Sequence, residues 1–221
     1  MAGRPVVVTV DKDAGVREWD VATWRSETLL ALPPEATGIR EAHCVVVDGH
    51  TLLVLGVSEA DALHVWDLST RGRVAGPLAN PRVTVASGIR TVTTPAFHRV
   101  VALDGRPVGI SPTEFPARGL AVWDILGERR LRWIGGVTSG WPRAEVGEWD
   151  GVPVVALTGT RRWRGGERSR VRLVNLRTGT TIEEIPLPAR AGALALDAGG
   201  HLAVGLDRDV LVLRHWKGHP R

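Results

Sequence analysis

Five short stretches of the chain alternate two sets of side chains in the same way. The clearest cover residues 15–21, 62–68 and 119–125, and weaker copies cover residues 170–176 and 209–215. Successive side chains of a β-strand point to opposite faces of a sheet, so this alternation predicts strands. In the last copy both sets are apolar, which is typical of a sheet that is covered on both sides. The pattern therefore predicts an all-β chain.

Polar residues end these stretches at matching positions. Three copies close on a Trp-Asp pair, the fourth closes on Asn, and small polar residues or glycines follow. Such residues suit a tight reversal of the chain. The signature positions of the repeat are Trp19, Asp20, Trp66, Asp67, Trp123, Asp124 and Asn175.

The copies recur at a spacing that indicates repeated structural units. Starting from Trp19, the equivalent positions follow after 47, 57, 51 and 39 residues. Periods in this range are typical of supersecondary units that bury their faces against one another. The chain is therefore predicted to consist of repeats.

The Trp-Asp pairs resemble those of the WD40-repeat family of β-propellers, whose four-stranded blades end their third strand in Trp-Asp. The resemblance covers essentially the whole chain and implies a β-propeller of about five four-stranded antiparallel blades. The Gly-His pair of that family is not recognisable at its usual offset, because Gly49-His50 and Gly200-His201 lie in the turn before a second strand. We therefore expect the hydrogen-bonded network of well-formed repeats to be absent or partial.

The strand pattern divides the chain into blades of unequal completeness. In the third blade we expect residues 89–93 and 99–103 as the first two strands, followed by an insertion over residues 104–118. The first blade lacks an inner strand and the last lacks an outer strand. The expected blades cover residues 5–32, 39–78, 89–134, 143–185 and 190–215.

Incomplete end blades expose apolar faces and unpaired strand edges, which soluble proteins avoid. Five blades lie within the usual range for a closed propeller, but the two chain ends here do not complement each other. We therefore expect either self-association or further blades N-terminal to this sequence.

Charge and composition narrow the class of partner. The formal net charge is +4, and hydrophobic residues make up 43% of the chain. A mild positive charge permits acidic partners without requiring nucleic acid. The single cysteine excludes an internal disulfide. Because the sequence has no signal-peptide pattern and no apolar stretch near the ~20 residues that span a bilayer, we expect a cytoplasmic protein without a membrane partner.

Sequence motifs for catalysis are absent. The chain has no glycine-rich phosphate loop, no His-Glu-x-x-His, no Cys-x-x-Cys and no Gly-x-Ser-x-Gly. We therefore predict no enzymatic activity, no cofactor and no metal site. The alternative is an enzyme with a site in the central channel, built from polar residues at the ends of inner strands. The candidates for that site are Arg40, Glu41, Arg90 and Arg190.

Two insertions carry the candidate binding surface. They cover residues 104–118 and 159–169, each between the second and third strands of its blade, and therefore share one rim of a propeller. Trp and Arg dominate the energetics of protein interfaces, and Arg pairs with carboxylates and phosphates. The candidate partner-binding residues are Arg161, Arg162, Trp163, Arg164, Trp141, Arg143, Phe115 and Arg118.

The resemblance to WD40 repeats implies a non-catalytic interaction scaffold, and we expect this surface to bind a protein partner or an acidic peptide. The alternative is binding of nucleic acid or an acidic ligand through the Arg/Trp loop 159–168, where stacking and phosphate contacts would combine. The modest charge and the scatter of basic residues along the chain disfavour nucleic acid. For each of these residues taken singly, the alternative is a structural role. In that case Trp163 packs on its own blade. Trp24, Trp133 and Trp216 are interpreted as packing or edge-covering residues.

Overall fold

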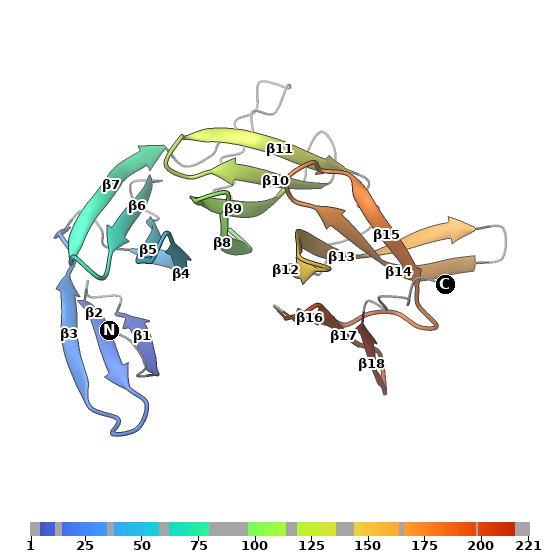
Figure 1. The fold of residues 1–221 in the computed structure, drawn as a ribbon, viewed down its shortest axis with the longest axis horizontal. Coiled ribbons are helices and arrows are strands. Elements are labelled where there is room, and N and C mark those ends of the chain that lie inside the picture. Colours follow the sequence, from blue (N-terminus) through green and yellow to red (C-terminus); the bar gives the residue numbers. More distant parts are fainter. Residues whose placement is uncertain are drawn as a thin grey trace. The chain divides into compact units, whose positions relative to one another are not determined.

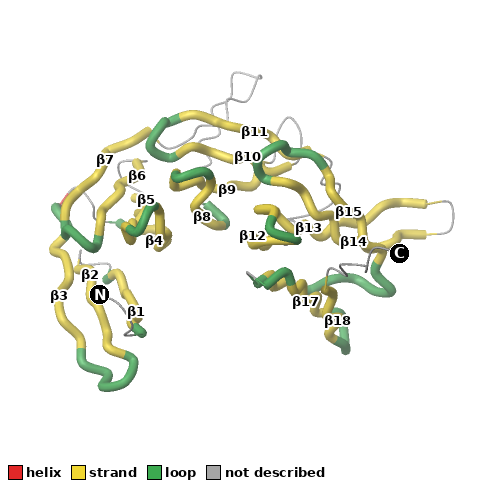
Figure 2. Tube along the Cα trace, in the orientation of Figure 1, coloured by secondary structure: helices red, strands yellow, loops and turns green. Residues whose placement is uncertain are grey.

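The computed structural model describes residues 5–11, 15–34, 38–57, 62–79, 97–113, 119–135, 144–163, 166–197 and 199–214. Most of this is β-strand, with turns between the strands (Figure 2). Within these ranges, no helix has the length and apolar character needed to cross a membrane. The chain forms two compact units, residues 1–109 with 123–129 and residues 110–122 with 130–221.

The first unit contains two complete sheets whose strands follow one another in chain order (Figure 1). The first sheet has three strands, β1 (Val6–Val10), β2 (Gly15–Asp20) and β3 (Ser26–Ala31). The second has four strands, β4 (Ile39–Val47), β5 (His50–Val57), β6 (Ala62–Asp67) and β7 (Gly72–Ala79). β2 and β6 are the strands that the alternation over residues 15–21 and 62–68 predicted.

The third sheet differs from its prediction. Its strands, in the order β11-β10-β9-β8, are β8 (Arg99–Leu103), β9 (Arg106–Thr113), β10 (Gly119–Asp124) and β11 (Arg129–Gly135). The division between the two units passes through this sheet.

The predicted insertion 104–118 is wrong in its first part, because the chain reverses at Asp104-Gly105 and returns as β9. Asp-Gly is a strong signal for a two-residue hairpin turn. After this turn, Val108 and Ile110 lie two residues apart on the strand, and both are fully buried. Among the described strands of this sheet, the segment 99–103 is the first, and the predicted strand 89–93 lies outside the described residues.

The second unit contains the last two sheets. The fourth sheet consists of β12 (Ala144–Trp149), β13 (Val152–Trp163), β14 (Gly166–Asn175) and β15 (Thr181–Pro186). The fifth consists of β16 (Ala193–Leu196), β17 (His201–Gly205) and β18 (Val210–Arg214). The prediction of antiparallel sheets with an incomplete first and last member is confirmed, because the described strands form sheets of three, four, four, four and three strands.

Asp-Gly turns set the register at the start of three sheets. They lie at residues 48–49, 104–105 and 150–151, and all six residues have positive φ angles. Two successive positive φ angles define the type I′ turn, whose twist matches that of antiparallel strands. The turn at 150–151 places Trp149 opposite Val152, and the pairing of β12 with β13 continues from there without a shift.

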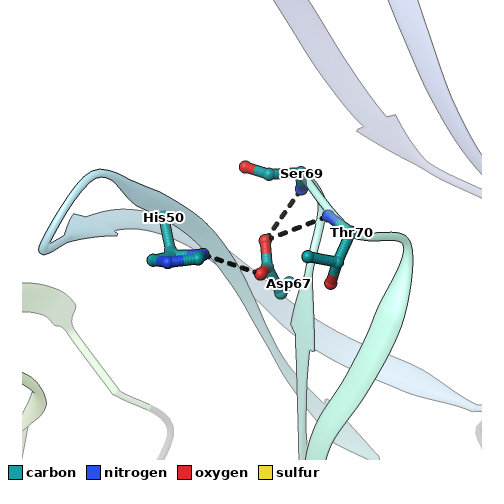
Figure 3. Close-up of polar contacts among 4 residues, drawn as sticks. All are labelled: His50, Asp67, Ser69 and Thr70. Atoms are coloured by element: carbon teal, nitrogen blue, oxygen red, sulfur yellow. Dashed lines mark hydrogen bonds and ion pairs between the residues drawn. The ribbon is translucent and has the colours of Figure 1, made fainter.

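A carboxylate closes the turn after the third strand of the second sheet (Figure 3). Asp67 Oδ1 accepts hydrogen bonds from the backbone N–H groups of Ser69 and Thr70 at 2.8 and 3.4 Å. Asp67 Oδ2 lies 2.9 Å from Nδ1 of His50, the first residue of β5. Burial alone would raise the pKa of Asp67, but the hydrogen bonds from His50, Ser69 and Thr70 outweigh it and hold that pKa below 3.8.

Related turns recur in the neighbouring sheets with different partners. Asp20 Oδ1 accepts from the N–H groups of Ala22 and Thr23 at 2.8 and 2.9 Å. At Asp124 the partner is Arg106, the first residue of β9, whose Nη1 lies 3.3 Å from Oδ2. A contact between the repeat aspartate and the start of the second strand is therefore present in two sheets, with His in one and Arg in the other.

Apolar side chains cover both faces of the inner strands. On β5, Leu52 and Val54 belong to one buried cluster, while Leu53 and Leu55 belong to another. In the second unit a cluster joins β13 and β14 to Leu202 and other residues of the fifth sheet. The edge strand β18 differs, because its residues Val210 and Val212 are 70% and 63% exposed.

The turn of Asp67 gives a prediction for the effect of pH on stability. A carboxyl whose pKa is lowered by folding adds stability that is complete above 3.8 and is lost as pH falls through the folded pKa. We expect Asp67→Asn to keep the turn, as Asn175 does in the fourth sheet, where its Oδ1 accepts from Arg177 N–H at 2.7 Å. The variant should be less stable than wild type at pH 7 and should lose less stability on acidification.

Urea unfolding of both proteins between pH 7 and pH values below the ordinary pKa of about 3.9 measures this difference. Asp207→Asn is the control, because Asp207 is exposed, and its curve should run parallel to that of wild type. The same acid dependence for wild type and Asp67→Asn would contradict the assigned role of the carboxylate.

Candidate functional site

The two longest described strands form a hairpin that extends beyond its own sheet (Figure 1). β13 has 12 residues and β14 has 10, whereas β12 and β15 have 6 each. The pairing of β12 with β13 ends at Leu157, and that of β15 with β14 begins at Arg170. Beyond these points β13 and β14 pair with each other as far as Trp163 and Gly166. We call residues 159–163 and 166–169 the hairpin extension.

The sequence prediction of a loop over 159–168 is therefore wrong. Thr160, Arg161, Arg162 and Trp163 continue β13 in unbroken antiparallel register with β14. Thr and Trp favour strands, and the extension has no proline to interrupt pairing. The glycine pair 165–166 is the sequence signal for a reversal that could have revealed the hairpin.

The register places arginines on one face of this hairpin. Residues directly opposite each other in an antiparallel pair share a face, and so do residues two apart along a strand. Arg161 pairs with Arg168, Gly159 with Arg170, and Leu157 with Arg172. These four arginine positions therefore share one face, which we call the basic face. The position of Trp163, two residues after Arg161, lies on the same face.

The other face of the extension has a different character. Arg162 pairs with Glu167, and Thr160 pairs with Ser169. A basic residue is thus directly opposite an acidic one, and the remaining pair is neutral. The register therefore assigns four arginine positions to one face of the hairpin and an arginine-glutamate pair to the other.

Two arginines of the basic face have defined contacts at the base of the extension. Arg170 Nη1 forms an ion pair with Glu184 Oε2 on β15. Arg172 Nη2 donates a hydrogen bond to the backbone oxygen of Gly135, at 2.5 Å. Burial lowers the pKa of Arg172, the charge of Arg170 lowers it further, and Glu184 acts in the opposite direction. Two arginines and one glutamate therefore lie close together at the base of the extension.

An aromatic ring lies next to Arg172. The ring of Trp133 covers Gly135, because a Cβ built on Gly135 would lie 2.3 Å from Cη2 of that ring. It also reaches Gly119, where a built Cβ would lie 2.9 Å from Nε1. Trp133 is 45% exposed, so its outer face is open to solvent. Trp133 and Arg172 thus both contact Gly135.

The interpretation as packing or edge-covering residues agrees with the position of Trp133 over two glycines, but Trp24 is largely exposed. Trp133 covers two glycines but keeps 45% of its surface exposed, and Trp24 is 68% exposed in the turn after β2. Trp216 lies outside the described residues. Gly135 was the sequence signal for the position of the Trp133 ring. Residues two apart on a strand share a face, and a glycine there leaves room for a flat ring.

The predicted partner-binding residues are only partly described. The backbone positions of Arg161 and Trp163 lie on the basic face, whereas Arg162 is on the opposite face. The predicted sharing of one rim by the two insertions is not tested here. The other predicted residues lie outside the described ranges: Arg164, Trp141, Arg143, Phe115 and Arg118.

The residues suggested for a channel site do not form a described cluster. Glu41 Oε2 lies 3.7 Å from His43 Nε2, and both residues share a face of β4. Arg40 and Arg190 are exposed, and Arg90 lies outside the described residues. In the described part of the chain, no group of three or more His, Cys, Asp or Glu residues could hold a metal ion.

Comparison with solved structures identifies the fold. The chain matches the structure of the Dos1 propeller with a TM-score of 0.54 at 12% sequence identity, over 96% of this chain and 56% of that chain. It matches TolB from Acinetobacter baumannii with a TM-score of 0.52 at 15% identity, over 96% and 48% of the two chains. A gluconolactonase from Xanthomonas campestris matches with a TM-score of 0.50 at 15% identity, over 96% and 69%.

These neighbours are β-propellers, so the predicted β-propeller fold is confirmed. The chain spans 48% and 56% of the TolB and Dos1 structures, about half of each. A search against models of known protein families found no match. Since the likeness is one of fold at low sequence identity, it does not carry the functions of these proteins to this chain.

The contact between Trp133 and Gly135 predicts the effect of adding one methyl group. We expect Gly135→Ala to displace the ring and to lower the free energy of unfolding by about 1–3 kcal/mol, as overpacking usually does. Gly159→Ala is the matched control, because a Cβ at Gly159 meets nothing within 4 Å. Urea unfolding measures both. In the double variant Trp133→Ala with Gly135→Ala, the cost of the added methyl group should largely disappear, and an unchanged cost would contradict the assigned contact.

Proposed function

We propose that the protein is a non-catalytic binding module and that the basic face binds an acidic segment of a protein partner. The observation that supports this is the sorting of Arg161, Arg168, Arg170 and Arg172 onto one face of the hairpin. Arginine forms paired, charge-assisted hydrogen bonds with carboxylates and is enriched where protein interfaces gain most of their affinity. An acidic partner would offset the repulsion between these cations.

The exposed ring of Trp133 supports the same proposal. A tryptophan adds apolar contact area at low cost in conformational entropy, and its position next to Arg172 places an apolar patch beside the charges. Interfaces often combine a central aromatic or arginine anchor with a polar rim. The basic face with Trp133 at its base has this composition.

Two features favour a protein over a nucleic acid. The net charge of the chain is only +4. Glu184 lies among the arginines of the basic face, and Glu167 is on the other face of the extension. A continuous phosphate backbone would be repelled by these carboxylates, whereas a peptide with discrete acidic residues can avoid them. A cytoplasmic site of action is part of the proposal.

We also propose that the blades are of the WD40 type. The support is the Trp-Asp ending of three third strands and the contact of that aspartate with the first residue of the second strand, His50 in one sheet and Arg106 in another. The resemblance of this chain to WD40 repeats implies an interaction module. The gluconolactonase among the structural neighbours is an enzyme by its title, so the fold alone does not decide between binding and catalysis.

Charge reversal on the two faces of the extension tests the proposed site. We expect Arg161→Glu to weaken binding of a fluorescent oligoglutamate peptide at least about tenfold, because it removes one cation and places an anion beside Arg168. Arg162→Glu makes the same change in net charge on the other face, opposite Glu167, and should weaken binding less than about threefold. Fluorescence anisotropy at physiological ionic strength gives both dissociation constants.

Circular dichroism of both variants serves as the folding control. Equal losses in the two variants would mean that the peptide senses only the overall charge, and the proposed site would then be wrong. No binding of the peptide to wild type would reject the proposed function itself.

A further inference from the structure

The geometry of the hairpin extension also suggests how a partner binds, provided that the proposed function holds. We infer that the partner segment is an extended peptide with acidic residues at every second position, and that it adds as a strand to the edge of β13 over residues 159–163, which has no strand partner among the described residues. This inference concerns the conformation and the sequence spacing of the ligand, which the proposed function leaves open.

The spacing of the arginines gives the first argument. Arg168, Arg170 and Arg172 occupy every second position of β14. A strand rises by about 3.3–3.4 Å per residue, so these positions are about 7 Å apart. An extended peptide repeats its side chains on one face with the same period and nearly the same distance. Acidic residues at alternate positions would therefore stay in step with the arginines over several residues.

The unpaired edge of β13 gives the second argument. In the described part of the chain, β12 pairs with β13 only as far as Leu157, while β13 itself continues to Trp163. Residues 159–163 therefore have a strand partner on one side only among the described residues. The free backbone groups of such an edge are a template for an added strand. Backbone hydrogen bonds would provide affinity, and alternate side chains would provide specificity.

The arrangement of side chains around Gly159 gives the third argument. In a strand added to β13, the residue opposite Arg161 shares its face and lies about 4.5–5.5 Å away, within reach of a carboxylate. The residue two positions along is opposite Gly159, where a Cβ would meet nothing within 4 Å. Arg170 is the cross-strand partner of Gly159. An acidic side chain of the added strand can thus reach across Gly159 toward Arg170.

Arg170 is already paired with Glu184, and this limits the contribution of its charge. Its guanidinium has five N–H donors in a fixed fork, so a second carboxylate can bind on the side away from Glu184. We therefore expect Arg161 and Arg168 to contribute most of the electrostatic attraction and Arg170 to fix the spacing. The peptide would use two of its acidic residues against these positions, opposite Arg161 and opposite Gly159.

Two peptides of identical composition test the inference with the full chain. In the first, Glu and Thr alternate; in the second, the same residues are arranged as Glu-Glu and Thr-Thr pairs. We expect the alternating peptide to bind at least about tenfold more tightly by fluorescence anisotropy. A third peptide, the alternating sequence with N-methyl groups on every second backbone nitrogen, should lose most of this affinity if it is methylated on the edge that faces β13. The isomer methylated on the other nitrogens is its control.

Each outcome decides between the two proposals. Equal binding of the alternating and paired peptides, or equal binding of both N-methylated isomers and the parent peptide, would overturn the extended-strand inference and leave the acidic-partner function in place. Binding of neither acidic peptide would overturn both. Tighter binding of a single-stranded oligothymidylate than of either peptide would also overturn both, in favour of nucleic acid.

Discussion

The register of one hairpin is the constraint on which the candidate site depends. Side chains of a strand alternate with a period of two, so a slip by one residue would move every side chain to the other face. At residues 150–151 a two-residue turn fixes the start of β13 against β12, and β14 then pairs with β13 without a shift over ten residue pairs. The Asn175 side chain closes the far end of β14 with hydrogen bonds to the next turn. The grouping of arginines on one face is thus a consequence of the unshifted pairing of β13 with β14.

Much of the fold could be predicted from the sequence because its signals are local. Alternation marked the third strand of every repeat, and the polar residues Asp20, Asp67, Asp124 and Asn175 marked the turns that follow. The third sheet was misread where two signals competed. Residues 104–118 were taken for one insertion, although Asp104-Gly105 is a hairpin turn and residues 106–113 form a strand.

The candidate site was harder to predict because it depends on pairing between distant residues. Sequence order placed Arg161, Arg162, Trp163 and Arg164 in one basic cluster, but strand register separates Arg162 from Arg161 and joins Arg161 to Arg168. The exposure of Trp133 depends on Gly119 and Gly135, which belong to different strands. No property of Trp133 alone distinguishes it from the buried Trp149.

The hairpin extension also separates the residues proposed to bind a ligand from the residues that stabilise the fold, two demands that usually compete in a small protein. Residues 159–163 and 166–169 lie beyond the backbone pairing with β12 and β15, while the buried residues Val154, Ala156, Val171 and Leu173 form the core nearer its base. We therefore expect substitutions in the extension to change the stability of the blade little. A surface of this kind can change its ligand preference through mutation while the underlying sheet stays intact, so sequence divergence at these positions would carry information about partners and little about folding.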